Sequence, residues 1–136
     1  MADSTVALRW TGEGMQFVGG APDRPEVLLD GNGRVAPSPV QTLLLALAAC
    51  TGSDIVEITG KMRVTLASLQ VHVEGDRNQD FPRRFNRIRM VFRAGGVAES
   101  DRDKVRHAVR LSEEKYCSVL HTLRTDLAFS SEVEFA

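Results

Sequence analysis

Residues 38–62 read SPVQTLLLALAACTGSDIVEITGKM, and this stretch decides the fold. Ser38 and Pro39 are typical of a helix start, because serine caps free backbone amides and proline loses nothing where the amide has no partner. We therefore predict a helix that runs from there to about Lys61 or Met62. Its first half is apolar on every side, which indicates a buried helix, and its second half becomes amphipathic.

Before and after this helix the sequence contains short runs that are typical of β-strands. In these runs apolar and polar residues alternate, or turn residues flank the run. The predicted strands cover residues 6–10, 15–18, 26–29, 69–74, 85–93 and 132–135. Further helices are predicted over Glu99–Leu111 and around Cys117–Leu123, with a turn starting at Ser112 between them. These elements predict one α+β domain over residues 1–136, with antiparallel sheets and a long buried central helix.

Length and composition narrow the class of protein. The chain has 136 residues, enough for one domain or one protomer of an intertwined oligomer. Its 43% hydrophobic and 26% charged residues are typical of a soluble globular protein, and a net charge of -1 gives no reason to expect nucleic acid or a membrane as partner. The first residues lack a signal-peptide pattern, and the longest apolar run, Leu43–Cys50, is far shorter than the roughly 20 residues of a membrane span. We expect a cytoplasmic protein.

The chain contains two cysteines, Cys50 and Cys117. Thiols in the cytoplasm stay reduced unless they are catalytic or redox-sensing, so a structural disulfide is a poor interpretation. Two unrelated buried cysteines are the alternative. Cys50 lies well beyond the first turn of its helix, where the helix dipole no longer acts, so a reactive Cys50 needs a cation or donor from another segment. Cys117 lies near a predicted helix start, where free amides can support a thiolate.

Three charged or titratable residues follow the cysteines at helical spacing. Asp54 and Glu57 lie on the same helix face as Cys50 and mark the beginning of its polar stripe. They are supporting candidates for the site, or else they form a face that is solvated or paired with Lys61. His121 stands four residues after Cys117 and either shares its face or is an ordinary surface histidine.

Other kinds of site have weaker support. Two cysteines and three histidines without a C-x-x-C pair offer no recognisable metal-ligand set, so we expect no metal. The arginines between Arg83 and Arg93 alternate with apolar residues, which is typical of the solvent face of a strand. Few aromatic residues suited to stacking bases accompany them, so nucleic acid is not expected as a partner.

Two sequence motifs, in the same order along the chain, resemble those of a known protein family. SPVQTLLLALAACTGSDIVEI (38–58), followed by EKYCSVLHTL (114–123), resembles the OsmC/Ohr family of osmotically induced and organic hydroperoxide resistance proteins. The chain is most similar to its OsmC-like branch, and the pattern W-x-G-x-G-M-x-F at Trp10–Phe17 agrees with the family's first hairpin. The resemblance implies a swapped, intertwined homodimer with the long helices packed at its centre and two active sites at the interface.

The resemblance also implies a chemistry. Cys50 would be the peroxidatic residue of a thiol-dependent peroxidase that reduces organic hydroperoxides, and hydrogen peroxide as well, in oxidative-stress defence. Cys117 would be the resolving residue, forming a disulfide that an external dithiol reduces. A lipoyl-type dithiol serves in the hydroperoxide-resistance branch, and no metal, flavin or haem cofactor is implied.

This sequence departs from the family pattern at the residues that activate the thiolate. In the family's peroxidases an arginine in the first hairpin turn contacts the thiolate, and a glutamate directly after the motif proline orients it. Here the turn TGEGMQF has no arginine, and Val40 and Gln41 follow Pro39. The candidates for the missing cation are Arg24, Arg34 and an arginine of a partner subunit. Arg34, which shortly precedes the helix, is our first candidate, with Gln41 as a supporting residue. The missing pair leaves a second hypothesis, a non-enzymatic OsmC-like protein that binds a small ligand or responds to redox state.

Overall fold

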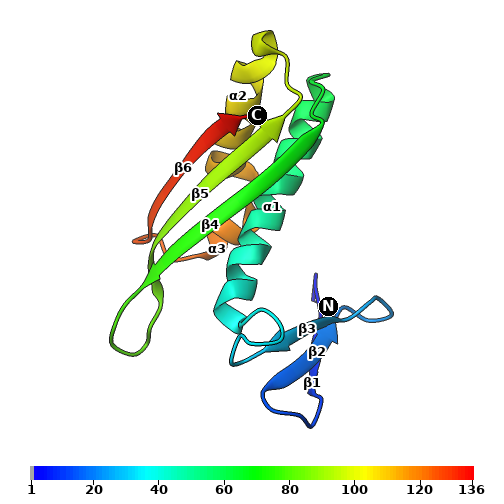
Figure 1. Cartoon of the computed structure of the whole chain (residues 1–136), viewed down its shortest axis with the longest axis vertical. Helices are drawn as coiled ribbons and strands as arrows, with labels where there is room; N and C mark the ends of the chain where they lie inside the picture. The colour runs from blue at the N-terminus through cyan, green and yellow to red at the C-terminus, as the bar shows by residue number, and fades with distance from the viewer. Residues whose placement is uncertain (1) are drawn as a thin grey trace. The chain divides into compact units, whose positions relative to one another are not determined.

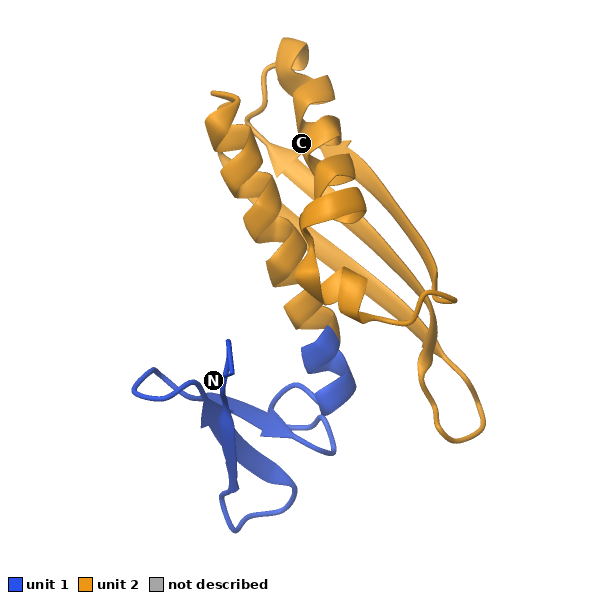
Figure 2. Cartoon of the chain, turned by 180° about the vertical axis from the view of Figure 1, so that it is seen from behind, with its two compact units in different colours: residues 1–43 blue, residues 44–136 orange. Residues whose placement is uncertain are grey.

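The computed structural model describes residues 2–136, which divide into two compact units, one ending at Leu43 and the other covering Leu44–Ala136 (Figure 2). The elements are β1 (Ala7–Trp10), β2 (Gln16–Gly20), β3 (Val27–Asp30), α1 (Pro39–Lys61), β4 (Ser68–Arg77), β5 (Phe85–Gly95), η1 (Glu99–Asp101), α2 (Arg102–Leu111), η2 (Ser112–Tyr116), α3 (Ser118–Thr122) and β6 (Ala128–Phe135). The predicted strands are all present, and the α+β class is confirmed.

The first unit is organised by a turn that a buried carboxylate holds. Strands β1, β2 and β3 form an antiparallel sheet, and β3 ends at Asp30. The Asp30 side chain accepts backbone N–H bonds from Asn32, Arg34 and Val35 at 2.9, 3.0 and 3.0 Å. The bonds from Val35 and Asn32 lower the pKa of the Asp30 carboxyl most. This turn is therefore fixed by side-chain-to-backbone bonds.

Helix α1 begins with a capping box. The Gln41 backbone N–H donates to Ser38 Oγ at 3.2 Å, and the Ser38 backbone N–H donates to Gln41 Oε1 at 2.9 Å. These bonds satisfy amides that the first helical turn leaves unpaired. The predicted start and end of the helix are confirmed, and the Gln41 side chain is used in the cap.

Helix α1 buries one stripe within this chain. Leu47, Thr51, Ile55 and Thr59, four residues apart along the helix, are buried. Leu45, in the first half of the helix, is 56% exposed, so the prediction that this half is buried on every side is wrong for the single chain. The helix is long and apolar enough by composition to cross a membrane, a test that core helices of soluble proteins also pass.

The second sheet has the order β4-β5-β6, and α1 and α2 cover one of its faces (Figure 1). Strands β4 and β5 form the predicted antiparallel hairpin. Strand β6 instead pairs parallel to β5, which departs from the expected antiparallel sheets. The reason is the long connection through α2, η2 and α3, which returns the chain to the starting end of β5. Ile88, Met90 and Phe92 of β5 are fully buried and form the centre of the core.

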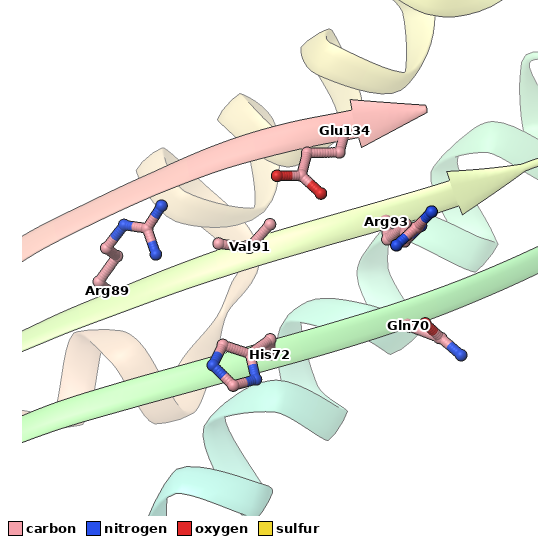
Figure 3. A pocket seen from close by; sticks show the side chains of 6 residues that line it. All are labelled: Gln70, His72, Arg89, Val91, Arg93 and Glu134. Carbon is pink, nitrogen blue, oxygen red and sulfur yellow. The ribbon is translucent and has the colours of Figure 1, made fainter. Parts of the chain in front are cut away.

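The opposite face of this sheet is polar. An open depression of about 330 Å³ lies on it, and the helices lie behind the strands in this view (Figure 3). It is lined by Gln70, His72, Arg89, Val91, Arg93 and Glu134. Arg89 is paired with Glu132 of β6, and His72 lies 3.1 Å from Glu74. The arginines thus face outward as predicted.

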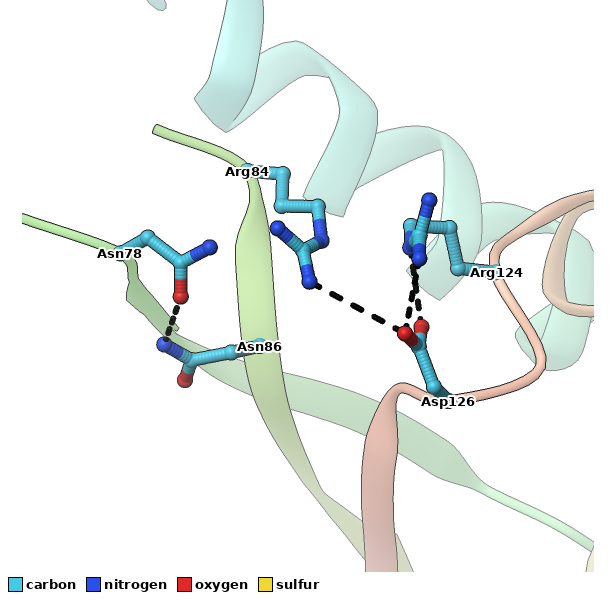
Figure 4. Close-up of polar contacts among 5 residues, drawn as sticks. All are labelled: Asn78, Arg84, Asn86, Arg124 and Asp126. Carbon is cyan, nitrogen blue, oxygen red and sulfur yellow. Dashed lines mark hydrogen bonds and ion pairs between the residues drawn. The ribbon is translucent and has the colours of Figure 1, made fainter. Parts of the chain in front are cut away.

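Polar contacts tie the ends of the β4–β5 hairpin to its surroundings (Figure 4). Asp126, just before β6, accepts two bonds from Arg124 at 2.9 and 2.8 Å and lies 3.9 Å from Arg84. Across the hairpin, Asn86 donates to the Asn78 side chain at 2.7 Å. These contacts fix the hairpin beside the strand that completes the sheet.

Candidate functional site: the Cys50–Cys117 thiol pair

Two segments that are distant in sequence bring the cysteines together. Cys50 lies on α1, and Cys117 lies between η2 and α3. Both thiols are free, and Cys50 packs against the core cluster that contains Cys117. Cys117 is fully buried, whereas Cys50 is partly exposed. One cysteine of the pair is therefore partly exposed in the single chain and the other is enclosed.

Cys117 owes its position to an irregular turn. Residues 112–116 form the π-helical turn η2, and the Cys117 backbone N–H donates to the Ser112 carbonyl at 2.8 Å. The backbone then becomes extended at Cys117, which caps α3. The Leu120 N–H donates to Cys117 Sγ at 3.4 Å, so the sulfur takes the place of an N-cap side-chain oxygen. The helix start predicted near Cys117 is present.

Thr51 is a second partner of the buried sulfur. Its Oγ1 lies 3.4 Å from Cys117 Sγ and 3.1 Å from the Leu47 carbonyl oxygen, and its side chain is 1% exposed. Sequence reasoning did not select this residue. The signal that could have found it is a lone polar residue on the stripe that Leu47 and Ile55 define, directly after Cys50.

Burial and hydrogen bonds act on the buried thiol in opposite directions. Burial raises the pKa of Cys117 above its ordinary value, because a thiolate loses its hydration there. The hydrogen bonds with Thr51 and Leu120 lower this pKa, and the neighbouring Cys50 thiol raises it again. The balance is a raised pKa, so the buried thiol is protonated at neutral pH.

Asp54 acts on the turn that carries Cys117. Its carboxylate accepts a hydrogen bond from Ser112 Oγ at 2.7 Å, and Ser112 is fully buried. Because the Ser112 carbonyl holds the Cys117 amide, this bond fixes the start of η2 against α1. Ser112 was also missed from the sequence, since serine in a polar run looks like a surface residue.

The other predicted site residues have other partners. Glu57 pairs with Lys61 at 3.2 Å on the exposed face of α1, as the alternative interpretation expects for Glu57, whereas Asp54 departs from it by bonding to Ser112. The His121 Nε2 lies 2.8 Å from the Glu113 carbonyl oxygen, and the His121 ring is exposed. Arg34 belongs to the first unit, where its backbone N–H bonds to Asp30.

Among residues 44–136, no cation contacts either sulfur through a hydrogen bond or ion pair. The part of the chain that the structure describes has no group of three or more His, Cys, Asp or Glu side chains that could hold a metal ion. The partners of the Cys117 sulfur within the second unit are the Thr51 hydroxyl and the Leu120 N–H.

Comparison with known proteins identifies the family to which the chain belongs. The family model described as OsmC-like protein matches residues 30–132. Protein YhfA of Escherichia coli strain K12 is 37% identical over 113 residues, which cover 82% of this chain and 83% of that protein. A hypothetical protein from Aquifex aeolicus VF5 has a TM-score of 0.81 at 28% identity, covering 100% of this chain and 99% of that one. An organic hydroperoxide resistance protein OsmC from Legionella pneumophila shares the fold, with a TM-score of 0.67 at 16% identity over 98% and 99% of the two chains. The chain therefore belongs to the OsmC-like family, within the OsmC/Ohr fold.

Proposed function

We propose that this protein is a thiol-dependent peroxidase that reduces organic hydroperoxides, with Cys50 as the peroxidatic residue and Cys117 as the resolving residue. The observation that supports it is the placement of two free thiols from α1 and the η2–α3 junction beside each other. In the single chain Cys50 is partly exposed, and Cys117 is enclosed beside it.

The proposed reaction has two steps on the protein. The Cys50 thiolate attacks the peroxide, the O–O bond breaks, an alcohol leaves, and Cys50 becomes a sulfenic acid. Cys117 then attacks this sulfur, so that an S–S bond forms, the S–O bond breaks and water leaves. An external dithiol, of the lipoyl type in our proposal, reduces the disulfide and completes the cycle. These steps need no prosthetic group.

The proposal includes a homodimer in the cytoplasm. Leu45 and Val56 leave apolar surface exposed on α1, and Leu8, Trp10 and Val27 do so in the first unit. Apolar surface of this extent is typical of an interface, and a second copy of the chain would cover it. The partner would also be the source of the activating cation. Sedimentation of the full chain should show a dimer, and a stable monomer would contradict this part.

Stopped-flow mixing of the reduced protein with cumene hydroperoxide tests the activity. The wild type should consume the peroxide and form an intramolecular disulfide, and Cys50→Ser should abolish both. Cys117→Ser is the matched control, because it should still consume one equivalent of peroxide and retain a sulfenic acid at Cys50. Peroxide consumption that is absent, or that persists without Cys50, would refute the proposal.

One observation favours a second candidate, a non-enzymatic protein that binds a small ligand or responds to redox state. Among residues 44–136 neither sulfur has a cationic partner that would stabilise a thiolate. Mass spectrometry of the native protein should then find a co-purified ligand, retained equally in Cys50→Ser. A wild type without ligand that consumes peroxide rapidly would exclude this candidate.

A further inference from the structure

The Thr51 hydroxyl has one proton and two acceptors within reach. It lies 3.1 Å from the Leu47 carbonyl oxygen and 3.4 Å from Cys117 Sγ. A hydroxyl donates one hydrogen bond and accepts others. When Thr51 donates to Leu47, its contact with the sulfur requires Cys117 to donate, so Cys117 is then a protonated thiol.

Turning the hydroxyl toward the sulfur costs the helix little. The Leu47 carbonyl already accepts the Thr51 backbone N–H, as every i, i+4 pair in a continuous α-helix does. The carbonyl therefore remains satisfied when the hydroxyl leaves it. After rotation, a Cys117 thiolate would receive two donors, the Thr51 O–H and the Leu120 N–H that lies 3.4 Å away.

The surroundings offer the thiolate no other support. The residues of β5 that share its core cluster, Ile88, Met90 and Phe92, are apolar. Of the titratable groups on neighbouring segments, Cys50 faces the sulfur, Asp54 is bonded to Ser112, and the His121 ring is bonded to the Glu113 carbonyl. The Glu113 carboxylate is bonded to Ser131. Thr51 is thus the one side-chain donor to this sulfur among residues 2–136.

We propose that Thr51 is the switchable donor of the site, which allows Cys117 to ionise and thereby sets the rate at which it attacks oxidised Cys50. This inference rests on the two-cysteine reaction proposed above. In that step the Cys117 thiolate forms the S–S bond, the Cys50 S–O bond breaks, and the hydroxide that leaves combines with the proton given up by Cys117 as water. The hydroxyl returns to Leu47 once the sulfur no longer carries a charge.

The chain supplies a matched control for the test. Thr59 is also buried, on the same stripe of α1, and its hydroxyl bonds to the Ile55 and Val56 carbonyls at 2.7 and 3.3 Å rather than to a cysteine. Thr51→Val and Thr59→Val therefore remove the same kind of buried hydroxyl, but only the first removes a partner of Cys117. Thr51→Ser keeps the hydroxyl and loses a methyl group.

The rate of each step is measured after mixing reduced protein with one equivalent of cumene hydroperoxide. Dimedone trapping followed by mass spectrometry reports the sulfenic acid, and the disulfide is quantified in parallel. Thr51→Val should slow disulfide formation about tenfold at neutral pH, because one hydrogen bond to a charged group is lost. Thr51→Ser and Thr59→Val should resemble the wild type. Disulfide formation in Thr51→Val as fast as in Thr59→Val would overturn the inference.

A titration separates this inference from the proposed function. In a Cys50→Ala background, the pKa of Cys117 is followed by the chemical shift of its Cβ, with and without Thr51→Val. The second substitution should raise this pKa by about one unit. The shift is expected even if the wild type consumes no peroxide, in which case only the proposed function fails. An unchanged pKa would overturn the role of Thr51.

Discussion

The hydrogen bond between Asp54 and Ser112 should contribute measurably to the free energy of unfolding, more than the residue types Asp and Ser alone would indicate. Asp54→Ala leaves a fully buried Ser112 hydroxyl without its acceptor, and an unsatisfied buried polar group costs about 1–3 kcal/mol. Alanine is the better helix former by about 0.5 kcal/mol, which offsets part of this loss. We expect the free energy of unfolding to fall by about 1.5 kcal/mol.

The partner substitution should cost less, and the two should not add. Ser112→Ala leaves the Asp54 carboxylate, which is only half-buried and can turn to water, so we expect a loss of about 1 kcal/mol. Removing both partners leaves no unsatisfied group. The double variant should therefore be no less stable than Asp54→Ala, which corresponds to a coupling of about 1 kcal/mol.

Urea unfolding followed by circular dichroism at a single protein concentration measures this cycle. Ser53→Ala on α1 is the control, because it removes an exposed hydroxyl that bonds only to the Ala49 carbonyl, and it should change stability by less than about 0.5 kcal/mol. Strictly additive losses in the double variant would refute the reasoning. So would a loss in Asp54→Ala no larger than that of the control.

Three further perturbations have defined outcomes. Burial raises the pKa of the Glu113 carboxyl above its ordinary value, so the folded state binds more protons than the unfolded chain between these two pKa values. The free energy of unfolding therefore falls as pH rises through that interval. Glu113→Gln, which can still accept a hydrogen bond from Ser131, should raise the Tm at pH 8 and flatten its pH dependence, and an unchanged profile would contradict this. Phe92→Ala should cost about 3–5 kcal/mol in urea unfolding, since Phe92 is fully buried, and a loss below about 1 kcal/mol would contradict its place in the core. Ser38→Ala should cost about 1 kcal/mol and speed hydrogen exchange in the first turn of α1, whereas exchange equal to wild type would show that the bond with Gln41 is unimportant.

Features with local causes could be predicted from the sequence. The bounds of α1 follow from Ser38, Pro39 and the apolar pattern behind them, and the hairpin strands follow from their period of two. The direction of β6 could not be predicted, because the alternation of apolar and polar residues is the same in a parallel and an antiparallel pair of strands. What decides it is the length of the connection, which depends on how α2, η2 and α3 pack.

The candidate site was predictable only in part. The two motifs pointed to Cys50 and Cys117, but Thr51 and Ser112 act through contacts with residues 66 and 58 positions away, which no local pattern encodes. Glu57 and His121 were candidates because helical spacing places them on the same face as a cysteine. In the structure, Glu57 pairs with Lys61, and the His121 ring bonds to the Glu113 carbonyl. Spacing along a helix does not show which neighbour a charged side chain will choose.

The parallel pairing of β5 and β6 has a consequence for how the chain matures. Parallel strands can pair only across the whole connection between them, so this pairing has high contact order. Cys117 lies inside that connection, whereas Cys50 lies on α1. Phe129 and Val133 of β6 pack against the core cluster that holds Cys117 and contacts Cys50, so a chain in which β6 has not paired lacks part of the packing around both thiols.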